Sequence, residues 1–299
     1  MTFMTTNLTQ SISGKLLFAI LIITIGAEVD LYITRYSTLA SSLYDAIMVS
    51  SFFIGWKLNK RLVNPTDTPK TKRQRSLQFT GAFLIFFIGS TIINFYSGLV
   101  FHDFNNNYDQ NVQQYTDSQP SGDDVAPSDS VSTFFDQVDA VGPDIYTDAL
   151  AGLEEVWRLG YMILILVICK KIFHRRWEKG SRDIFLLIAL FITSILFGID
   201  HTLDTAQPWS VKIGAIVTFA NMGLLFGLIL YWTRNLWVAV IAHSVYDITA
   251  TISWYYFDTA VEAFAGVVFI VHLILLSLEK RQQNKRIKQQ IVDPIQMAE

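Results

Sequence analysis

The chain has 299 residues, of which 51% are hydrophobic and 16% are charged, and its formal net charge is −3 at pH 7. Charged residues make up roughly a quarter of an ordinary soluble domain, so this composition excludes that class. The charge balance also lacks a basic excess, and we expect no nucleic-acid partner. The composition is typical of a polytopic membrane protein.

Apolar stretches of about 20 residues recur along the chain, which is the length that a helix needs to cross a bilayer. These stretches are continuously apolar rather than alternating, so a membrane β-barrel is excluded. The predicted fold is all-α, a polytopic bundle of about eight transmembrane helices. The predicted spans are 15–35, 39–57, 78–101, 145–169, 183–201, 210–231, 235–255 and 259–278.

Charged residues are segregated along the chain. Basic residues gather at 57–75, 170–182 and 280–288, whereas the segment 102–148 carries ten aspartates. Because cytoplasmic loops are enriched in Lys and Arg, we expect the basic clusters and both termini in the cytoplasm. The protein is therefore predicted to be integral to the membrane and multi-pass, with the lipid bilayer as its first partner.

The same features divide the chain into five parts. We expect a polar N-terminal tail at 1–13, three leading helices at 14–101, an acidic disordered extracellular loop at 102–143, a five-helix core at 144–278 and a basic cytoplasmic tail at 279–299. The loop prediction depends on a composition rich in Asn, Gln, Ser, Asp and Pro, which cannot bury enough apolar surface to become ordered.

Residues 152–160, GLEEVWRLG, place three charged side chains in the fourth predicted span. Each such group costs ~2.5–3.5 kcal/mol at a helix centre, so Glu154, Glu155 and Arg158 need partners. Residues three and four apart share a helix face, so Arg158 can pair with Glu155 or with Glu154. Either pairing leaves one carboxylate without a cation on its own helix. In the alternative interpretation, both glutamates belong to a purely structural ion-pair network.

Two histidines lie in later spans, each with a companion one turn away. Phe197 precedes His201 in FGIDH, and Asp247 follows His243 in HSVYD. A desolvated carboxylate beside two imidazoles can deprotonate a water, directly or on a divalent metal, and the imidazoles can stabilise the oxyanion at an attacked carbonyl. That chemistry is peptide hydrolysis. If the water is activated on a metal, we expect zinc, with Glu154, His201 and His243 as its ligands.

The EE…R, FxxxH and HxxxD motifs, in this order on successive apolar helices, resemble the CAAX protease and bacteriocin-processing family of intramembrane endopeptidases, also called Abi proteins. Its type II CAAX prenyl endopeptidases are the members that the chain resembles. The resemblance covers roughly 145–250, and residues 221–247 look like the closing region of that family. It implies a bacterial cell membrane and a protein or peptide substrate that is membrane-associated or prenylated.

The resemblance also implies roles for the motif residues. Glu154 would be the water-activating base, Glu155 the acid paired with Arg158, and His201 and His243 the other catalytic or metal-site groups. Phe197 would pack beneath His201, and Asp247 would fill the family's Asn-or-Asp position. The family usually has Arg four residues after the second Glu, whereas here the spacing is three, so the roles of the two glutamates could be exchanged.

Two other functions remain open. The chain could be a non-catalytic membrane scaffold or a bacteriocin self-immunity protein with the same fold. Its buried titratable groups could also form the proton or ion pathway of a transporter. Among the remaining polar residues of the spans, His272 is expected to hydrogen-bond between helices, and Asp200 and Asp204 flank His201 with either a supporting role or simple solvation.

Overall fold

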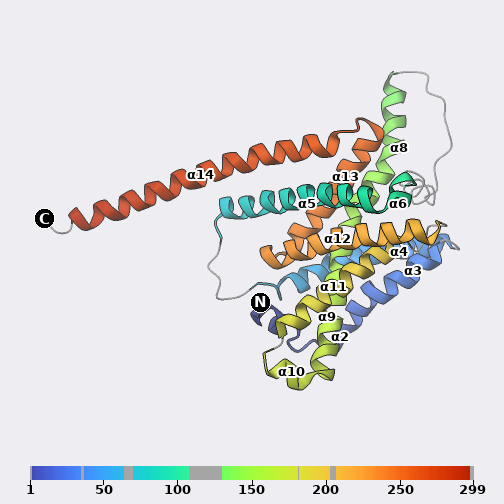
Figure 1. The fold of residues 1–299 in the computed structure, drawn as a ribbon, viewed down its shortest axis with the longest axis horizontal. Coiled ribbons are helices and arrows are strands. Elements are labelled where there is room, and N and C mark those ends of the chain that lie inside the picture. Colours follow the sequence, from blue (N-terminus) through green and yellow to red (C-terminus); the bar gives the residue numbers. More distant parts are fainter. Residues whose placement is uncertain are drawn as a thin grey trace.

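The computed structural model describes residues 2–34, 37–63, 70–107, 130–180, 182–202 and 207–296, and its regular secondary structure in these ranges is helical (Figure 1). In chain order the elements are α1 (Thr2–Leu8), α2 (Gly14–Leu21), the π-helix η1 (Ile22–Gly26), α3 (Ala27–Thr34), α4 (Thr38–Asn59), α5 (Lys72–Val100), α6 (His102–Asn106), α8 (Ser130–Ala151), α9 (Glu154–Ile172), α10 (His174–Glu178), α11 (Arg182–Asp200), α12 (Trp209–Thr233), α13 (Leu236–Tyr255) and α14 (Ala260–Gln296). The predicted all-α bundle is confirmed.

Five helices of the described chain are long and apolar enough to cross a membrane: α5, α11, α12, α13 and residues 260–284 of α14. They correspond to five of the eight predicted spans. The second predicted span falls on α4, and the first falls on a helical run of α2, η1 and α3 that includes a π-helical turn. The fourth, 145–169, is divided between α8 and α9. These last three crossings stay predictions.

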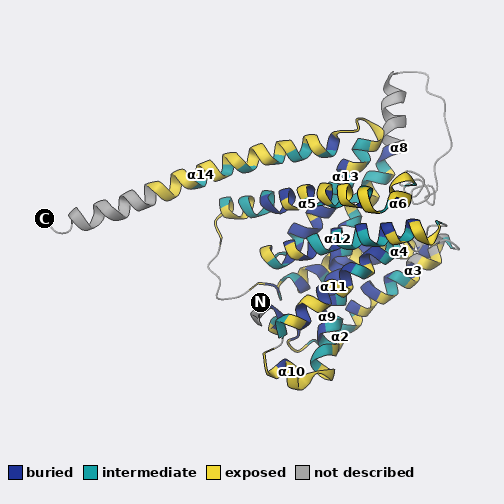
Figure 2. Cartoon of the chain, in the orientation of Figure 1, coloured by how far each residue is buried: buried dark blue, intermediate teal, exposed yellow. Residues whose placement is uncertain are grey.

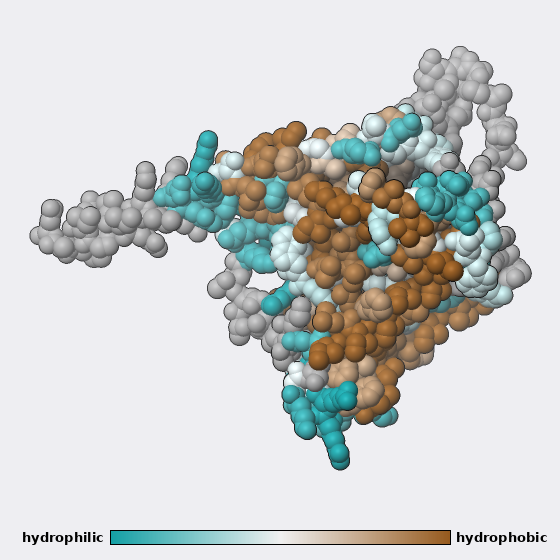
Figure 3. Space-filling model, in the orientation of Figure 1, coloured by the Kyte–Doolittle hydropathy of each residue, from teal (hydrophilic) through white to brown (hydrophobic). Residues whose placement is uncertain are grey.

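Large apolar side chains cover much of the outside of the bundle, as for Phe53, Phe95 and Phe191. In the space-filling view, hydrophobic residues spread over the middle of the visible face, and hydrophilic residues gather around α10 and at other ends of the molecule (Figure 3). Figure 2 shows the complementary distribution, with buried residues concentrated on α9, α11 and α12 in the interior. A soluble monomer does not expose so large an apolar surface. The protein is an integral membrane protein.

Close helix packing in the interior depends on small residues. A Cβ at Gly198 on α11 would collide with the Ile216 carbonyl on α12. Glycine at this position lets the two backbones approach, as small residues commonly do between membrane helices. The approach of α11 to α12 carries Phe197 and His201 at the end of α11 toward the centre of the bundle.

The N-terminal segment differs from the polar tail predicted for 1–13. It contains α1, which packs against α9 and α11 and buries Met4 and Leu8. Arg61, just after α4, donates a hydrogen bond to the Asn7 carbonyl. These partners are distant in sequence, so the composition of the segment alone does not indicate its order.

The acidic connection also differs from the disordered loop predicted for 102–143. It contains α6 and the first part of α8, while its residues 108–129 lie outside the described chain. The sequence of α8 has apolar residues at the three- and four-residue intervals of a helix, namely Val131, Phe134, Phe135, Val138 and Val141. This spacing favours a helix despite the acidic composition. At the other end of the chain, the predicted basic tail 279–299 continues α14 as a helix as far as Gln296.

Candidate active site

A glycine fixes the start of α9 against α13. The chain turns at residues 152–153, so the predicted single span 145–169 is two helices. A Cβ at Gly152 would collide with Ser244 Oγ and with a backbone carbonyl of α13. Only glycine permits that approach. This contact places the first turn of α9, which begins with Glu154, beside α13, the helix that carries His243.

Glu155 and Arg158 form a buried ion pair on α9. Their side chains are only 1% and 4% exposed, and the Arg158 guanidinium donates to Glu155 Oε2. The guanidinium also donates to the Gly223 carbonyl on α12 and lies 5.8 Å from the ring centroid of Phe197 on α11. The pair therefore connects three helices. It uses the three-residue spacing and leaves Glu154 without a cation on its own helix.

His243 on α13 lies between two carboxylates. Its Nδ1 is 3.4 Å from Glu155 Oε1, and its Nε2 is 3.2 Å from Asp247 Oδ2. The ring stacks on Phe226 with centroids 4.6 Å apart and meets Phe197 edge-on at 5.7 Å. Each ring nitrogen thus faces a carboxylate oxygen, and Nδ1 makes no hydrogen bond with Glu155.

His201 lies at the end of α11 between two aromatic rings. Its Nδ1 is 2.8 Å from the Phe197 carbonyl oxygen, and its ring stacks on Phe219 with centroids 4.5 Å apart. A carbonyl oxygen can only accept, so the proton of this hydrogen bond belongs to Nδ1. In the neutral ring Nε2 is then an acceptor, which is suited to holding a water or a substrate donor.

Glu154 is connected to these residues by electrostatic interactions rather than by a hydrogen bond or an ion pair. It interacts electrostatically with His243, Asp247 and Glu155. His201 interacts in the same way with His243 and Asp247. The structure thus brings the predicted site residues of α9, α11 and α13 into one neighbourhood, which we call the charged corner and define as Glu154, Glu155, Arg158, His201, His243 and Asp247.

Three polar residues outside the motifs adjoin the charged corner. Glu28 on α3 hydrogen-bonds to the Asp200 side chain, and Tyr161 OH donates to Glu28 Oε1 at 3.3 Å. Asp200 in turn interacts electrostatically with Glu154. Sequence reasoning gave Glu28 no role, although an acid within an apolar span is itself an indication of one. Asp204 lies outside the described residues.

The zinc option has no preformed group of ligands among the described residues. Among the residues described, no group of three or more His, Cys, Asp or Glu side chains is arranged to hold a metal ion. A zinc-bound histidine offers one ring nitrogen to the metal, whereas both nitrogens of His243 face carboxylates. Zinc binding by Glu154, His201 and His243 stays a prediction that metal analysis of the purified protein can test. No catalytic step below uses a metal.

Comparison with known proteins identifies one matching family. Residues 151–249 match the family described as Rce1-like, type II CAAX prenyl endopeptidase Rce1-like. No curated protein matches the chain, and no solved structure matches it. The matched region runs from the turn before α9 into α13 and includes every residue of the charged corner together with Phe197. The resemblance seen in the sequence motifs is thus confirmed over residues 151–249, which are similar to the Rce1-like family of type II CAAX prenyl endopeptidases.

Proposed function

We propose that the protein is an intramembrane endopeptidase in which Glu154 activates the attacking water. The observation that carries this proposal is the distribution of charge on α9. Arg158 makes its ion pair with Glu155, so Glu154 forms no direct ion pair on its helix and interacts with His243. A desolvated carboxylate in this position can accept a proton from a water molecule.

His201 is suited to orient that water. Its Nδ1–H is engaged by the Phe197 carbonyl, so Nε2 of the neutral ring can accept one water hydrogen while Glu154 takes the other as a proton. The water oxygen then forms a bond to the carbonyl carbon of the substrate. The π electron pair of the carbonyl moves to its oxygen and produces a tetrahedral oxyanion.

His243 assists at the oxyanion. Its ring is held between the Glu155 and Asp247 carboxylates, next to the reacting centre. A group that is fixed in place before the reaction stabilises developing charge most effectively in a site from which water is excluded. When the oxyanion collapses, the C–N bond breaks and Glu154 returns its proton to the departing amine.

The family match and the apolar exterior of the bundle support a substrate that is a protein or peptide at the membrane. We propose a membrane-associated or prenylated polypeptide, with glutamate rather than metal as the essential catalytic group. Cleavage by the protein would exclude the scaffold, self-immunity and transporter alternatives as its sole function.

The direct test is Glu154→Gln in proteoliposomes. The probe is a fluorescence-quenched peptide with a farnesylated CAAX end, compared with the same peptide without the prenyl group. We expect the variant to lower the cleavage rate by roughly 10²–10⁴-fold, the usual contribution of a general base. Glu262→Gln is the matched control, because Glu262 lies exposed in the first turn of α14. Cleavage by Glu154→Gln at the native rate would refute the proposed role.

A further inference from the structure

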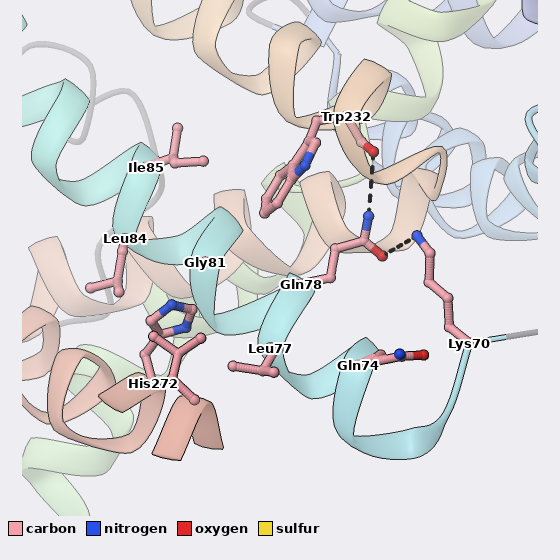
Figure 4. A pocket seen from close by; sticks show the side chains of 10 residues that line it. Lys70, Gln74, Leu77, Gln78, Gly81, Leu84, Ile85, Trp232 and His272 are labelled. Carbon is pink, nitrogen blue, oxygen red and sulfur yellow. Dashed lines mark hydrogen bonds between the residues drawn. The ribbon is translucent and has the colours of Figure 1, made fainter. Parts of the chain in front are cut away.

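A groove of about 700 Å³ lies between α5, the end of α12 and α14 (Figure 4). Its body is apolar. Of its polar residues, Lys70, Gln74 and Gln78 come from the start of α5 and the segment just before it, and His272 comes from α14. The close-up shows Trp232 and His272 projecting into the same space from α12 and α14. No residue of the charged corner lines it. We call it the α5–α14 groove.

The groove is held open by the absence of a side chain at Gly81. A Cβ there would lie 3.1 Å from the Trp232 ring and 3.5 Å from His272 Cε1. His272 Nδ1 is also 2.7 Å from Thr80 Oγ1, which fixes α14 beside α5. None of the membrane-spanning window of α14 is buried by the rest of the protein. An apolar space of this kind at a lipid-facing helix offers few partners to water and is suited to a hydrocarbon chain.

One end of the groove is basic. Lys70 Nζ donates to Gln78 Oε1 at 2.7 Å, and Gln78 Nε2 donates to the Trp232 carbonyl at 3.3 Å. Among the described residues, no acidic side chain lines the groove. A neighbouring cavity of about 610 Å³ is lined by Arg73 and Arg281, and Glu279 lies 3.9 Å from Arg73. The local balance therefore favours an anion.

We propose that the α5–α14 groove binds one anionic phospholipid of the surrounding membrane. An acyl chain lies along the apolar wall formed by Leu77, Leu84 and Leu276, and the phosphate lies at Lys70. Trp232 marks the level of the interface, where tryptophan is enriched in membrane proteins. A basic residue near the membrane surface attracts anionic lipid by ~1 kcal/mol, which corresponds to about fivefold in binding.

The test uses the full chain in mild detergent, with phosphatidylglycerol and phosphatidylcholine of identical acyl chains added in equal amounts. Native mass spectrometry reports the lipid retained. We expect phosphatidylglycerol to be retained in preference by about fivefold, and Lys70→Gln to remove most of that preference. Gly81→Leu fills the groove and should lower the retention of both lipids.

Matched controls separate the groove from general surface effects. Lys179→Gln changes an exposed lysine after α10, away from α14, and should leave the preference intact. Gly266→Leu adds the same side chain to α14 where nothing lies within 4 Å, and should leave retention intact. Equal retention of the two lipids by the native chain, or a preference that survives Lys70→Gln, would overturn the proposal. Because Lys70 is exposed, that variant remains informative if Gly81→Leu fails to fold. Peptidase activity is not part of the readout, so this test is independent of the proposed reaction.

Discussion

The charged corner and the α5–α14 groove both place polar side chains among apolar helices, but they stabilise them differently. In the charged corner, Glu155 and Arg158 are almost fully buried and neutralise each other. Beside the groove, Arg73 and Glu279 are only loosely paired at 3.9 Å and partly exposed. A charged side chain is thus tolerated in the interior when it belongs to a network that connects several helices. At the edge of the bundle, a charged side chain can remain available to a ligand.

The two histidines of α13 and α14 show the same contrast. His243 has carboxylates near both ring nitrogens. His272 meets a neutral hydroxyl, Thr80 Oγ1, as the sequence predicts for a hydrogen bond between helices. The neighbours of an imidazole determine whether it can take part in acid–base chemistry. Of these two histidines, only His243 lies beside charged groups. Substitutions in the charged corner should therefore affect folding and chemistry together, whereas those in the groove should affect neither strongly.

The largest expected difference in stability concerns the two arginines. Arg158→Met leaves Glu155 buried without its partner and should destabilise the protein by ~3–5 kcal/mol. Arg73→Met removes a partly exposed pair and should cost no more than ~1 kcal/mol. Thermal unfolding in one detergent compares the two variants. Adding Glu155→Gln to Arg158→Met should recover part of the loss, and similar destabilisation by both single arginine variants would contradict the comparison.

A smaller effect is expected at Glu28, which extends the polar network beyond the matched region. Glu28→Gln keeps the shape of the side chain but removes the carboxyl group that interacts with Asp200. The cleavage rate should fall by about tenfold, because a hydrogen bond involving a charged group contributes ~1.5–3 kcal/mol and only part of that acts on Glu154. Thermal stability should change little. A rate equal to that of the Glu262→Gln control would show that Glu28 has no influence on the reaction.

The smallest effect is expected at His272. His272→Phe removes the hydrogen bond to Thr80 but keeps an aromatic ring of similar size on α14. The loss of stability should be ~0.5–1.5 kcal/mol, and the cleavage rate should stay close to the native value. Parallel unfolding and cleavage assays on one preparation measure both quantities. A strong loss of cleavage at unchanged stability would place His272 in the reaction and break the contrast between the two regions.

The sequence predicts the main features of this molecule because apolar length and helical spacing are local properties. The sequence alone indicates the glutamates, Arg158 and the two histidines as candidate site residues, because an ionisable group in an apolar span is costly and usually functional. The sequence does not show in advance that Arg158 pairs with Glu155 rather than with Glu154, because residues three and four apart lie on the same face of a helix. That choice depends on the side-chain positions of the packed helices, which also give Arg158 the Gly223 carbonyl as a second partner.

Other features cannot be predicted from the sequence, because they also depend on how distant segments pack together. α1 is ordered by contacts with α9 and α11, and Glu28 enters the polar network through Asp200 and Tyr161. Each of these contacts joins segments more than 100 residues apart. The turn at Gly152 is a further case, because the need for glycine arises from Ser244 on another helix.

The central claim is that Glu154 and His201 act on one and the same water molecule. A double-mutant cycle on cleavage measures this, with Glu154→Gln, His201→Gln and the combined variant in the same liposomes. Groups that act as a unit are strongly non-additive, so we expect the combined variant to cleave no more slowly than Glu154→Gln alone. If the two single losses multiply in the combined variant, the acid and the imidazole act independently and the proposed site is wrong.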